Sequence, residues 1–412
     1  YISVTGVQTC ALPIWFYLLR LFDMSVATWT AVAINAAVAV IGFALAGLAK
    51  YSVVNEIAEV ETAPETSEIV TDAIPLEPEE PATRPVYVAI ALSGFCALGA
   101  EVVWTRLLSM MLGATVYTFS IILAVFLAGL GFGSSAGAAL AKKLKNPRIA
   151  LGVCQFLLAA ATAWAAYAIS TLIPSADFDP TIPVNPLDVF RLDLVRCTWA
   201  ILPSACLWGA SFPLALAALA RRSESENEAD SGALVGKTYA ANTAGAILGA
   251  LAFSMILIPA TGTQQAERWL VIMSAVSAIV ALASSISFAN VVKAVAVAAA
   301  AAALAWTVKP VPWLALGYGR RMNQYVSYNS KPLFIGEGMN SSIVVSEYPN
   351  GTRYFHVSGK VEATTETFDM RLQRMLGHLS AMFVKKPESV LVVGFGAGVT
   401  RSEEHTSELQ SH

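Results

Sequence analysis

The sequence predicts a polytopic α-helical membrane protein to which a smaller α/β segment is appended. Hydrophobic residues make up 56% of the 412 residues and charged residues only 13%, whereas globular domains carry about 25% charged residues. The mean hydropathy is +0.60. Long apolar stretches recur between residues 15 and 310, and strand-like alternation begins only after residue 310. A membrane unit is therefore expected to precede an extramembrane unit.

The two ends of the chain do not match the segments beside them. Residues 1–14 precede an apolar run without forming a signal peptide, and residues 401–412 add a polar stretch without periodicity. Val4–Ile14 can be encoded by DNA whose opposite strand, in a shifted frame, encodes Ser402–Ser411. The DNA sequences that encode two unrelated protein ends are not expected to be reverse complements of each other. We interpret both ends as translated sequencing adapter, leave them out of the fold argument, and expect a protein cut at both ends.

Apolar stretches of membrane-spanning length recur along the chain. A bilayer core requires about 20 apolar residues per helix, and seven or eight stretches reach this length. The first lies within residues 15–49, and the others form a helical bundle within residues 87–310. The stretches are residues 26–49, 87–110, 114–141, 149–173, 194–220, 238–260, 266–287 and 289–307.

Residues 50–86 separate the first expected helix from the bundle. Within them, residues 55–85 carry nine acidic residues, several prolines and no basic residue before Arg84. Such a composition cannot bury a hydrophobic core, so it predicts a disordered linker.

Residues 311–400 carry the patterns of strands and of an amphipathic helix. Asn350-Gly351 stands between two alternating runs, which is the strongest short signal of a β-hairpin. Residues 367–384 have the periodicity of an amphipathic helix, and residues 389–394 have the pattern of a buried strand. These elements indicate an α/β unit outside the membrane.

The distribution of Lys and Arg predicts the orientation in the membrane. The basic residues 142–148 indicate a cytoplasmic loop. Alternation then puts residues 221–237 in the cytoplasm and the acidic, proline-rich residues 175–186 outside. If the last apolar stretch spans the membrane, the α/β segment lies outside as well. We nevertheless expect a multi-pass protein of the inner (plasma) membrane with a cytoplasmic α/β segment, because basic residues follow that stretch: Lys309, Arg320, Arg321 and Lys331.

Other classes of partner find little support in the composition. The net charge of −3 gives no indication of nucleic-acid binding. The cysteines of the apolar stretches lack C-x-x-C spacing, so they are interpreted as small core residues. We expect the lipid bilayer as a partner, no nucleic acid and no metal site. These cysteines are Cys96, Cys154, Cys197 and Cys206.

Three polar residues inside the expected helices are candidates for a transport path. A charge at bilayer depth is costly and often marks such a path or an ion pair. Glu101 and Arg106 are five residues apart, about 140° around a helix, so they do not pair directly. Alternatively, Arg106 extends to the membrane interface and Glu101 bonds to a neighbouring helix. Asn242 either lines a substrate path or lies at a close helix contact made by Gly245 and Gly249.

A glycine-rich turn follows the expected strand at residues 389–394. Gly394, Gly396 and Gly398 lack the Cβ atoms that would keep the backbone away from an adenosyl ligand. The spacing differs from the dinucleotide motif G-x-G-x-x-G, and no P-loop lysine is present. A simple strand-to-helix turn is the alternative.

Several segments resemble a known family. Residues 93–134 (SGFCALGAEVVWTRLLSMMLGATVYTFSIILAVFLAGLGFGS), 239–250 (YAANTAGAILGA) and 337–400 are similar to fused major facilitator/spermidine synthase membrane proteins. Gly137–Asn146 has the outline of the facilitator loop motif, although Ala141 replaces its acid. The resemblance covers residues 15–400. It implies a major-facilitator-like bundle, followed at residues 311–400 by part of a spermidine synthase-like domain with the class I methyltransferase fold.

The resemblance also implies an activity. Such enzymes transfer an aminopropyl group from decarboxylated S-adenosylmethionine to an amine, with no metal and no tightly bound cofactor. The central catalytic residues are expected after Thr400, so this chain is not expected to be catalytically competent. The implied cosubstrate-binding residues are Gly394, Gly396, Gly398 and Glu362, and the implied amine-binding residues are Asp369 and His378.

Departures from the family pattern concern the substrate. Ala397 replaces an acid of the glycine loop, Leu372 replaces a tyrosine and Arg374 replaces a glutamate. An amine nucleophile must be held and deprotonated, which suits carboxylates, so these changes disfavour a diamine. Three functions remain open. They are a membrane-bound spermidine synthase-like enzyme of polyamine biosynthesis, a major-facilitator-type transporter with a non-catalytic nucleoside-binding domain, and an S-adenosylmethionine-dependent methyltransferase.

Overall fold

The computed structural model divides the chain into two compact units, Tyr1–Ala82 and Thr83–His412. In the first unit only scattered helical positions between residues 26 and 41 are described. In the second unit the described residues are 83–175, 185–223, 231–283 and 288–383, with isolated positions from 385 to 400. The expected first helix therefore lies mostly outside the described residues, as do the expected linker before Thr83 and residues 401–412.

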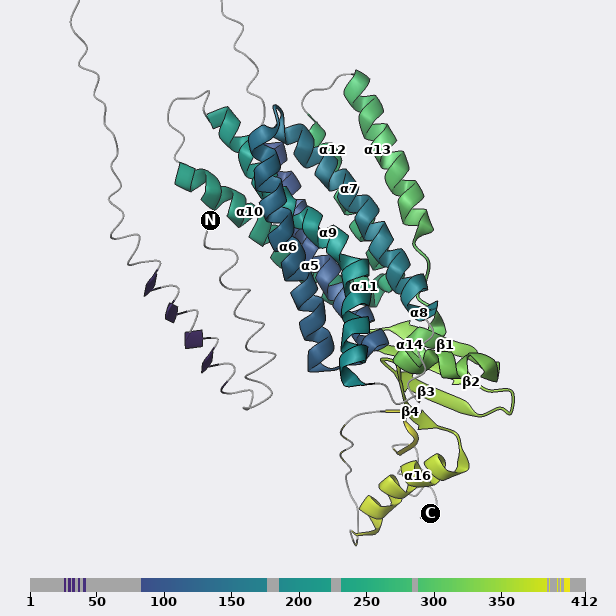
Figure 1. Ribbon diagram of the computed structural model, residues 1–412. Helices are drawn as coiled ribbons and strands as arrows, with labels where there is room; N and C mark the ends of the chain where they lie inside the picture. The colour runs from purple at the N-terminus through teal and green to yellow at the C-terminus, as the bar shows by residue number, and fades with distance from the viewer. Residues whose placement is uncertain are drawn as a thin grey trace, which may run out of the picture. The chain divides into compact units, whose positions relative to one another are not determined.

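In the part of the chain that the structure describes, seven helices are long and apolar enough to cross a membrane. They confirm the expected stretches from residue 87 to residue 307, and the chain is a multi-pass membrane protein. Figure 1 shows them running alongside one another, with α13 at the edge of the bundle. The helices are α5 (Arg84–Leu112), α6 (Val116–Lys143), α7 (Pro147–Tyr167) with η2 (Ala168–Leu172) and α8 (Ile173–Ser175), α9 (Pro186–Ser223), α10 (Ser231–Ala252) with η3 (Phe253–Leu257) and α11 (Ile258–Thr261), α12 (Thr263–Leu282) and α13 (Phe288–Thr307).

The ends of the helices follow from local sequence. Pro85 lies in the first turn of α5, where a missing N–H leaves no hydrogen bond unmade. Thr115 caps α6, since its Oγ1 accepts a hydrogen bond of 3.2 Å from the N–H of Thr118. Lys142 and Lys143 in the last turn of α6 face the negative end of the helix dipole.

Glycines bring α10 into backbone contact with α5. A Cβ atom added to Gly245 would lie 1.9 Å from the carbonyl oxygen of Ala91, and one added to Gly249 would lie 2.1 Å from that of Phe95. Asn242 lies at the same contact, one turn earlier, where its carbonyl oxygen faces Gly94 of α5. Small residues at this spacing let two membrane helices approach closely.

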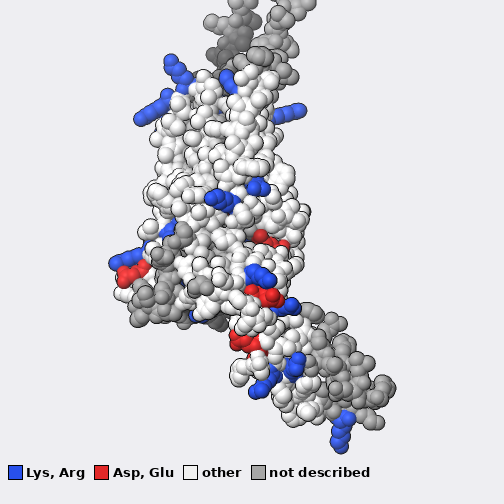
Figure 2. All heavy atoms as spheres, turned by 90° about the vertical axis from the view of Figure 1, so that its right-hand side faces the viewer, with Lys and Arg blue, Asp and Glu red and all other residues white. Residues whose placement is uncertain are grey.

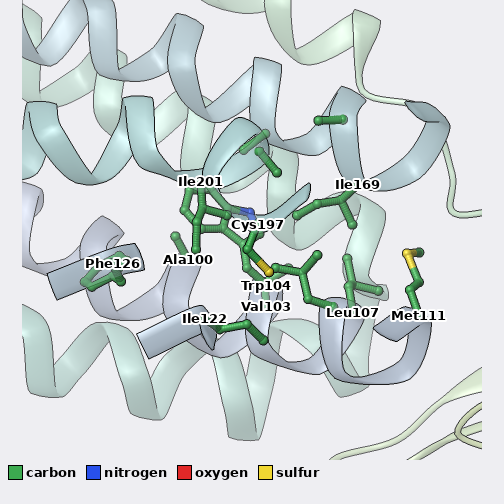
Figure 3. Close-up of a cluster of buried hydrophobic side chains, with 14 of the residues drawn as sticks. Ala100, Val103, Trp104, Leu107, Met111, Ile122, Phe126, Ile169, Cys197 and Ile201 are labelled. Atoms are coloured by element: carbon green, nitrogen blue, oxygen red, sulfur yellow. The ribbon is translucent and has the colours of Figure 1, made fainter. Parts of the chain in front are cut away.

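The largest buried cluster lies where α5 packs on α6, α9 and the π turn η2 (Figure 3). Trp104 and Leu107 of α5 are fully buried there, and the Trp104 ring lies 5.6 Å from the ring of Trp208 on α9. Inside a bilayer such packing acts mainly through van der Waals contacts, because the lipid tails are themselves apolar. The cluster fixes the middle of α5, the helix that also carries Glu101 and Arg106.

A four-stranded antiparallel sheet follows the bundle, with its strands in the order β1-β2-β3-β4. The expected hairpin is confirmed, because β2 pairs with β3 and Gly351 turns the chain with a φ of +81°. The expected helix is confirmed as α16, whereas β1 and β4 were not expected. The elements are α14 (Trp313–Tyr318), η4 (Gly319–Arg321), α15 (Met322–Tyr325), η5 (Val326–Tyr328), β1 (Lys331–Glu337), β2 (Ser342–Glu347), β3 (Arg353–Val357), β4 (Lys360–Thr364) and α16 (Thr367–Met382).

The expected buried strand at residues 389–394 is not seen at the positions that the structure describes. Leu391 and Val393 are 87% and 90% exposed and belong to no strand. The methyltransferase-like fold therefore stays a prediction, and the small antiparallel sheet is the observed feature of this region.

The two ends of the bundle differ in what they carry. The basic loop between α6 and α7 lies at one end, and the sheet lies at the other, where α5 ends and α12 begins (Figure 1). On the face shown in Figure 2, the end away from the sheet carries Lys and Arg side chains, whereas both basic and acidic side chains occur nearer the sheet.

Candidate functional site

Arg106 of α5 joins the bundle to the sheet. Its Nη1 donates a hydrogen bond of 2.7 Å to the carbonyl oxygen of Gly338, and its Nη2 donates one of 3.0 Å to Oγ of Ser342. Both partners belong to the β1–β2 hairpin. The guanidinium is therefore held by two neutral acceptors of the segment that follows the bundle, which is compatible with the expectation that Arg106 extends to the membrane interface.

Glu337, the last residue of β1, makes the second contact of the sheet with the bundle. Its carboxylate accepts hydrogen bonds of 3.2 Å from the backbone N–H of Thr263 and of 3.1 Å from Oγ1 of the same residue. Thr263 is the first residue of α12. The first N–H groups of a helix have no partner within the helix, and negative charge is favoured there by the helix dipole. Glu337 thus caps α12 from another element.

Glu267 lies one turn further along α12 and is fully buried. Neither of its carboxylate oxygens has a hydrogen-bond partner among the described residues. Its charge is close enough to that of Glu337 for the two to interact. Glu267 was not among the residues expected from the sequence, although an acidic residue within the apolar stretch 266–287 was the available signal.

Glu101 and Asn242, the other polar residues expected in the bundle, do not join this junction. Glu101 of α5 is half-buried, and Asn242 of α10 lies at the close contact with Gly94. Among the described residues no ion pair links Glu101 to Arg106.

A buried ion-pair network fixes the segment that leads from the bundle to the sheet. Asp193 of α9 lies 3.8 Å from Arg196 and 3.6 Å from Arg320. Arg320 also donates a hydrogen bond of 2.9 Å to the carbonyl oxygen of Leu112 at the end of α5. The network holds η4 against the ends of α5 and α9.

His356 on β3 is held on both sides of its ring. Its Nδ1 lies 3.0 Å from the carbonyl oxygen of Gly317, and its Nε2 lies 2.8 Å from Oγ of Ser346. A ring nitrogen facing a carbonyl must carry the proton, so Nε2 accepts from the Ser346 hydroxyl, an assignment made from the network. Burial lowers the pKa of His356 to about 4, and the bond to Gly317 only partly opposes this. Since both side chains are fully buried, the pair holds α14 on the sheet and does not face a substrate.

A group of aromatic rings covers this end of the sheet. We call Tyr318, Tyr325, Tyr328, Tyr348 and Tyr354 the tyrosine cluster. Tyr348 and Tyr354 have ring centroids 4.5 Å apart, and Oη of Tyr354 donates a short hydrogen bond to Oε1 of Glu366. Burial is the largest cause that raises the pKa values of Tyr348 and Tyr354, and the bond to Glu366 adds to it for Tyr354. Tyr348 and Tyr354 are thus neutral, and the carboxylate of Glu366 lies at the border of the cluster.

The residues implied in amine binding lie on α16 and do not converge. Asp369 accepts a short hydrogen bond from the N–H of Thr364, which pins the turn between β4 and α16. His378 is nine residues further along, about 180° around the helix. Glu362 on the edge strand β4 is exposed.

The glycine turn is described at two of its three glycines. Gly396 and Gly398 have φ values of +52° and +81°, a region that favours glycine, and a Cβ atom on Gly396 would meet nothing within 4 Å. Gly394 lies outside the described residues. Oγ1 of Thr400 donates a hydrogen bond of 3.1 Å to the carbonyl oxygen of Gln373, which brings the turn to α16. The open backbone fits the approach of an adenosyl ligand.

The cysteines and potential metal ligands add no further site within the described ranges. Cys96, Cys154, Cys197 and Cys206 are free. No group of three or more His, Cys, Asp or Glu side chains among the described residues could hold a metal ion.

Comparisons of the chain with models of protein families, with curated proteins and with solved structures found no match. The resemblance to fused major facilitator/spermidine synthase proteins therefore stays an expectation. The bundle, the docked sheet and the tyrosine cluster are the structural features that bear on the function.

Proposed function

We propose that this chain is a membrane transporter-type protein whose appended sheet is a binding module for a small amine. The observation that carries this proposal is the direct docking of the sheet on the bundle through Arg106 and Glu337. A module held by charged groups at the end of the bundle is well placed to pass the state of a ligand to the helices. A free-standing enzyme domain would need no such contacts.

The side of the membrane follows from the ends of the helices. Basic residues concentrate on the cytoplasmic side of multi-pass proteins, and the basic loop joins α6 to α7 at the end opposite the sheet. The start of α13 at that same end also carries Lys293. Of the basic residues that argued for a cytoplasmic sheet, Arg320 is paired with Asp193, and Lys331 with Glu347. We therefore favour the non-cytoplasmic side for the sheet, the alternative that the sequence left open.

The chemistry of the tyrosine cluster supports an amine as the ligand. Neutral tyrosine rings attract a cation over their faces, and Glu366 at the border of the cluster supplies a carboxylate. Tyr328 leaves 54% of its surface exposed. The proposed amine would bind with its charge at Glu366 and its apolar part against Tyr348 and Tyr354.

Calorimetry of the purified chain with spermidine and putrescine tests the amine ligand. The variant Glu366→Gln is expected to weaken binding by about 10- to 100-fold, since charge-assisted hydrogen bonds are about twice as strong as neutral ones. Glu362→Gln is the matched control, because it removes the same charge from the exposed edge strand. No heat with either amine, or weaker binding only in Glu362→Gln, would exclude the cluster as the amine site.

Uptake of labelled spermidine by proteoliposomes tests transport itself. The full chain is expected to accumulate the amine above the level of protein-free liposomes, and Glu101→Gln is expected to abolish uptake without lowering the amount of protein. Equal accumulation in both kinds of liposome would contradict a transport function for this amine.

A second candidate function, aminopropyl transfer, is favoured by the glycine turn alone. Gly396 and Gly398 would hold the adenosyl part of decarboxylated S-adenosylmethionine, and the family resemblance implies that Glu362 on β4 contacts the same cosubstrate. Bound decarboxylated S-adenosylmethionine would supply the aminopropyl group for transfer to an amine. Calorimetry with methylthioadenosine separates the two candidates, because only the enzyme requires a nucleoside site. A methyltransferase would bind S-adenosylmethionine at the same turn.

A further inference from the structure

The carboxyl group of Glu267 is the most unusual polar group in the described bundle. It lies one turn into α12, at the level where the sheet docks, and it is fully buried. Its two oxygens lack a hydrogen-bond donor among the described residues. Buried polar groups in native proteins nearly always have a partner, so this exception requires an explanation.

The groups around Glu267 do not neutralise it. From β1, Glu337 adds a second negative charge. From α5, Arg106 directs its guanidinium to the β1–β2 hairpin, where its charge interacts with Glu337 and not with Glu267. The thiol of Cys96 lies 3.9 Å from the carbonyl oxygen of Leu270. On α12 itself, Arg268 turns away and donates a hydrogen bond of 3.3 Å to the carbonyl oxygen of Val308.

An ionised carboxylate in this position is strongly unfavourable, because its hydration is lost without a compensating contact. The second carboxylate nearby increases the penalty. A proton on the Glu267 carboxyl removes both problems at once, because it makes the group neutral. A metal ion or an organic cation does not fit there, since Glu267 has no exposed surface and belongs to no cluster of metal-ligating side chains among the described residues.

We propose that Glu267 holds a proton at the junction between α12 and the docked sheet. Glu337 ties this occupancy to docking, because it caps α12 at Thr263 and also interacts electrostatically with Glu267. Release of the proton would leave two negative charges together and would favour withdrawal of Glu337 from the helix. The site thus gives the bundle a means of reporting its protonation state to the sheet.

Thermal unfolding of the purified full chain in nanodiscs tests this site without any transport assay. The pH is varied at constant ionic strength, with sodium chloride or choline chloride as the salt. If folded Glu267 holds a proton that the unfolded chain releases, stability falls as the pH rises. Stability is expected to be the same in sodium chloride and in choline chloride, because Glu267 belongs to no cluster of metal-ligating side chains among the described residues; a requirement for sodium would contradict the proton assignment.

The variant Glu267→Gln is expected to lose the pH dependence that the parent chain shows, because glutamine matches a neutral carboxyl in size. Glu362→Gln, which removes an exposed carboxylate of β4, is the control and is expected to keep it. Glu337→Gln leaves Glu267 in place and is expected to weaken its apparent proton affinity by about tenfold, because a neighbouring negative charge is removed.

Two other results would overturn the proposal. One is a parent chain and a Glu267→Gln variant with the same dependence on pH. The other, if Glu267→Gln does not fold, is a Glu337→Gln variant that responds like the parent. Because the measurement is stability, neither result depends on whether an amine is bound or transported.

Discussion

Replacement of Gly245 by alanine tests the close contact between α10 and α5. The added methyl carbon would lie 1.9 Å from the carbonyl oxygen of Ala91, whereas real Cβ atoms essentially never come within 3.0 Å of another heavy atom. The helices would have to separate by at least about 1 Å, and overpacking of this kind costs about 1–3 kcal/mol. The obstacle is backbone, so no side-chain rotation can relieve it.

The same helix offers a matched control for this substitution. Gly236 lies near the start of α10, where an added Cβ atom would meet nothing within 4 Å. Gly236→Ala is expected to stabilise the chain by about 0.5–1 kcal/mol, since alanine favours the helix. The free energy of unfolding in mixed detergent micelles, followed by circular dichroism, compares the two variants.

The double variant Gly245→Ala/Gly249→Ala gives a further check. Once one methyl group has separated the helices, the second overlap with α5 is already partly relieved. The combined loss is therefore expected to be smaller than the sum of the single losses, as for other neighbouring sites. Equal stability of Gly245→Ala and Gly236→Ala would show that α10 does not pack on α5 through these glycines, and the helix arrangement would be wrong.

Three further predictions concern the sheet. Arg106→Gln is expected to raise the rate of amide hydrogen exchange in the β1–β2 turn, because two charge-assisted hydrogen bonds are lost. Arg191→Gln, on the exposed start of α9, is the control and is expected to leave this rate unchanged. Equal exchange rates in the two variants would refute the docking role of Arg106. The pKa of His356 is lowered to about 4 in the folded chain, so the unfolded chain takes up a proton on this histidine at a higher pH than the folded chain does. Stability, measured by thermal unfolding, should therefore decline as the pH falls from about 6.5 to 4. The His356→Gln variant should not show that decline. Gly396→Ala, at a φ of +52°, is expected to weaken methylthioadenosine binding in calorimetry if the nucleoside site exists, while Gly351→Ala in the hairpin turn is expected to leave it intact.

The secondary structure that sequence predicted best is the part that depends on local patterns. The apolar stretches after residue 87 became helices because their length and composition match a bilayer, and Asn350-Gly351 formed a hairpin because glycine accepts a positive φ. The strands β1 and β4 carry no comparable signal. β4 is short and mostly exposed, and the Lys331–Glu337 strand pairs with β2 through a register shift, so only the tertiary pairing reveals them.

The candidate site was harder to predict because it joins segments far apart in the chain. Arg106 and Ser342 are 236 residues apart, and no spacing rule relates them. Glu267 lies near the predicted start of a helix, where charged residues are common, so its position in the sequence did not mark it as a site residue. Glu267 becomes a candidate because it is completely buried and because Glu337 of β1 interacts with it, and both features depend on the tertiary structure.

The docking contacts make the bundle and the sheet depend on each other. Without Glu337, the first N–H of α12 would lose its acceptor, and a buried unsatisfied backbone group is costly. Without the β1–β2 hairpin, the guanidinium of Arg106 would have neither of its two acceptors. Because each unit satisfies polar groups of the other, a change in either is transmitted at this junction. Glu267 lies directly behind it, so the charge on that carboxyl is the variable most able to decide whether the sheet stays docked.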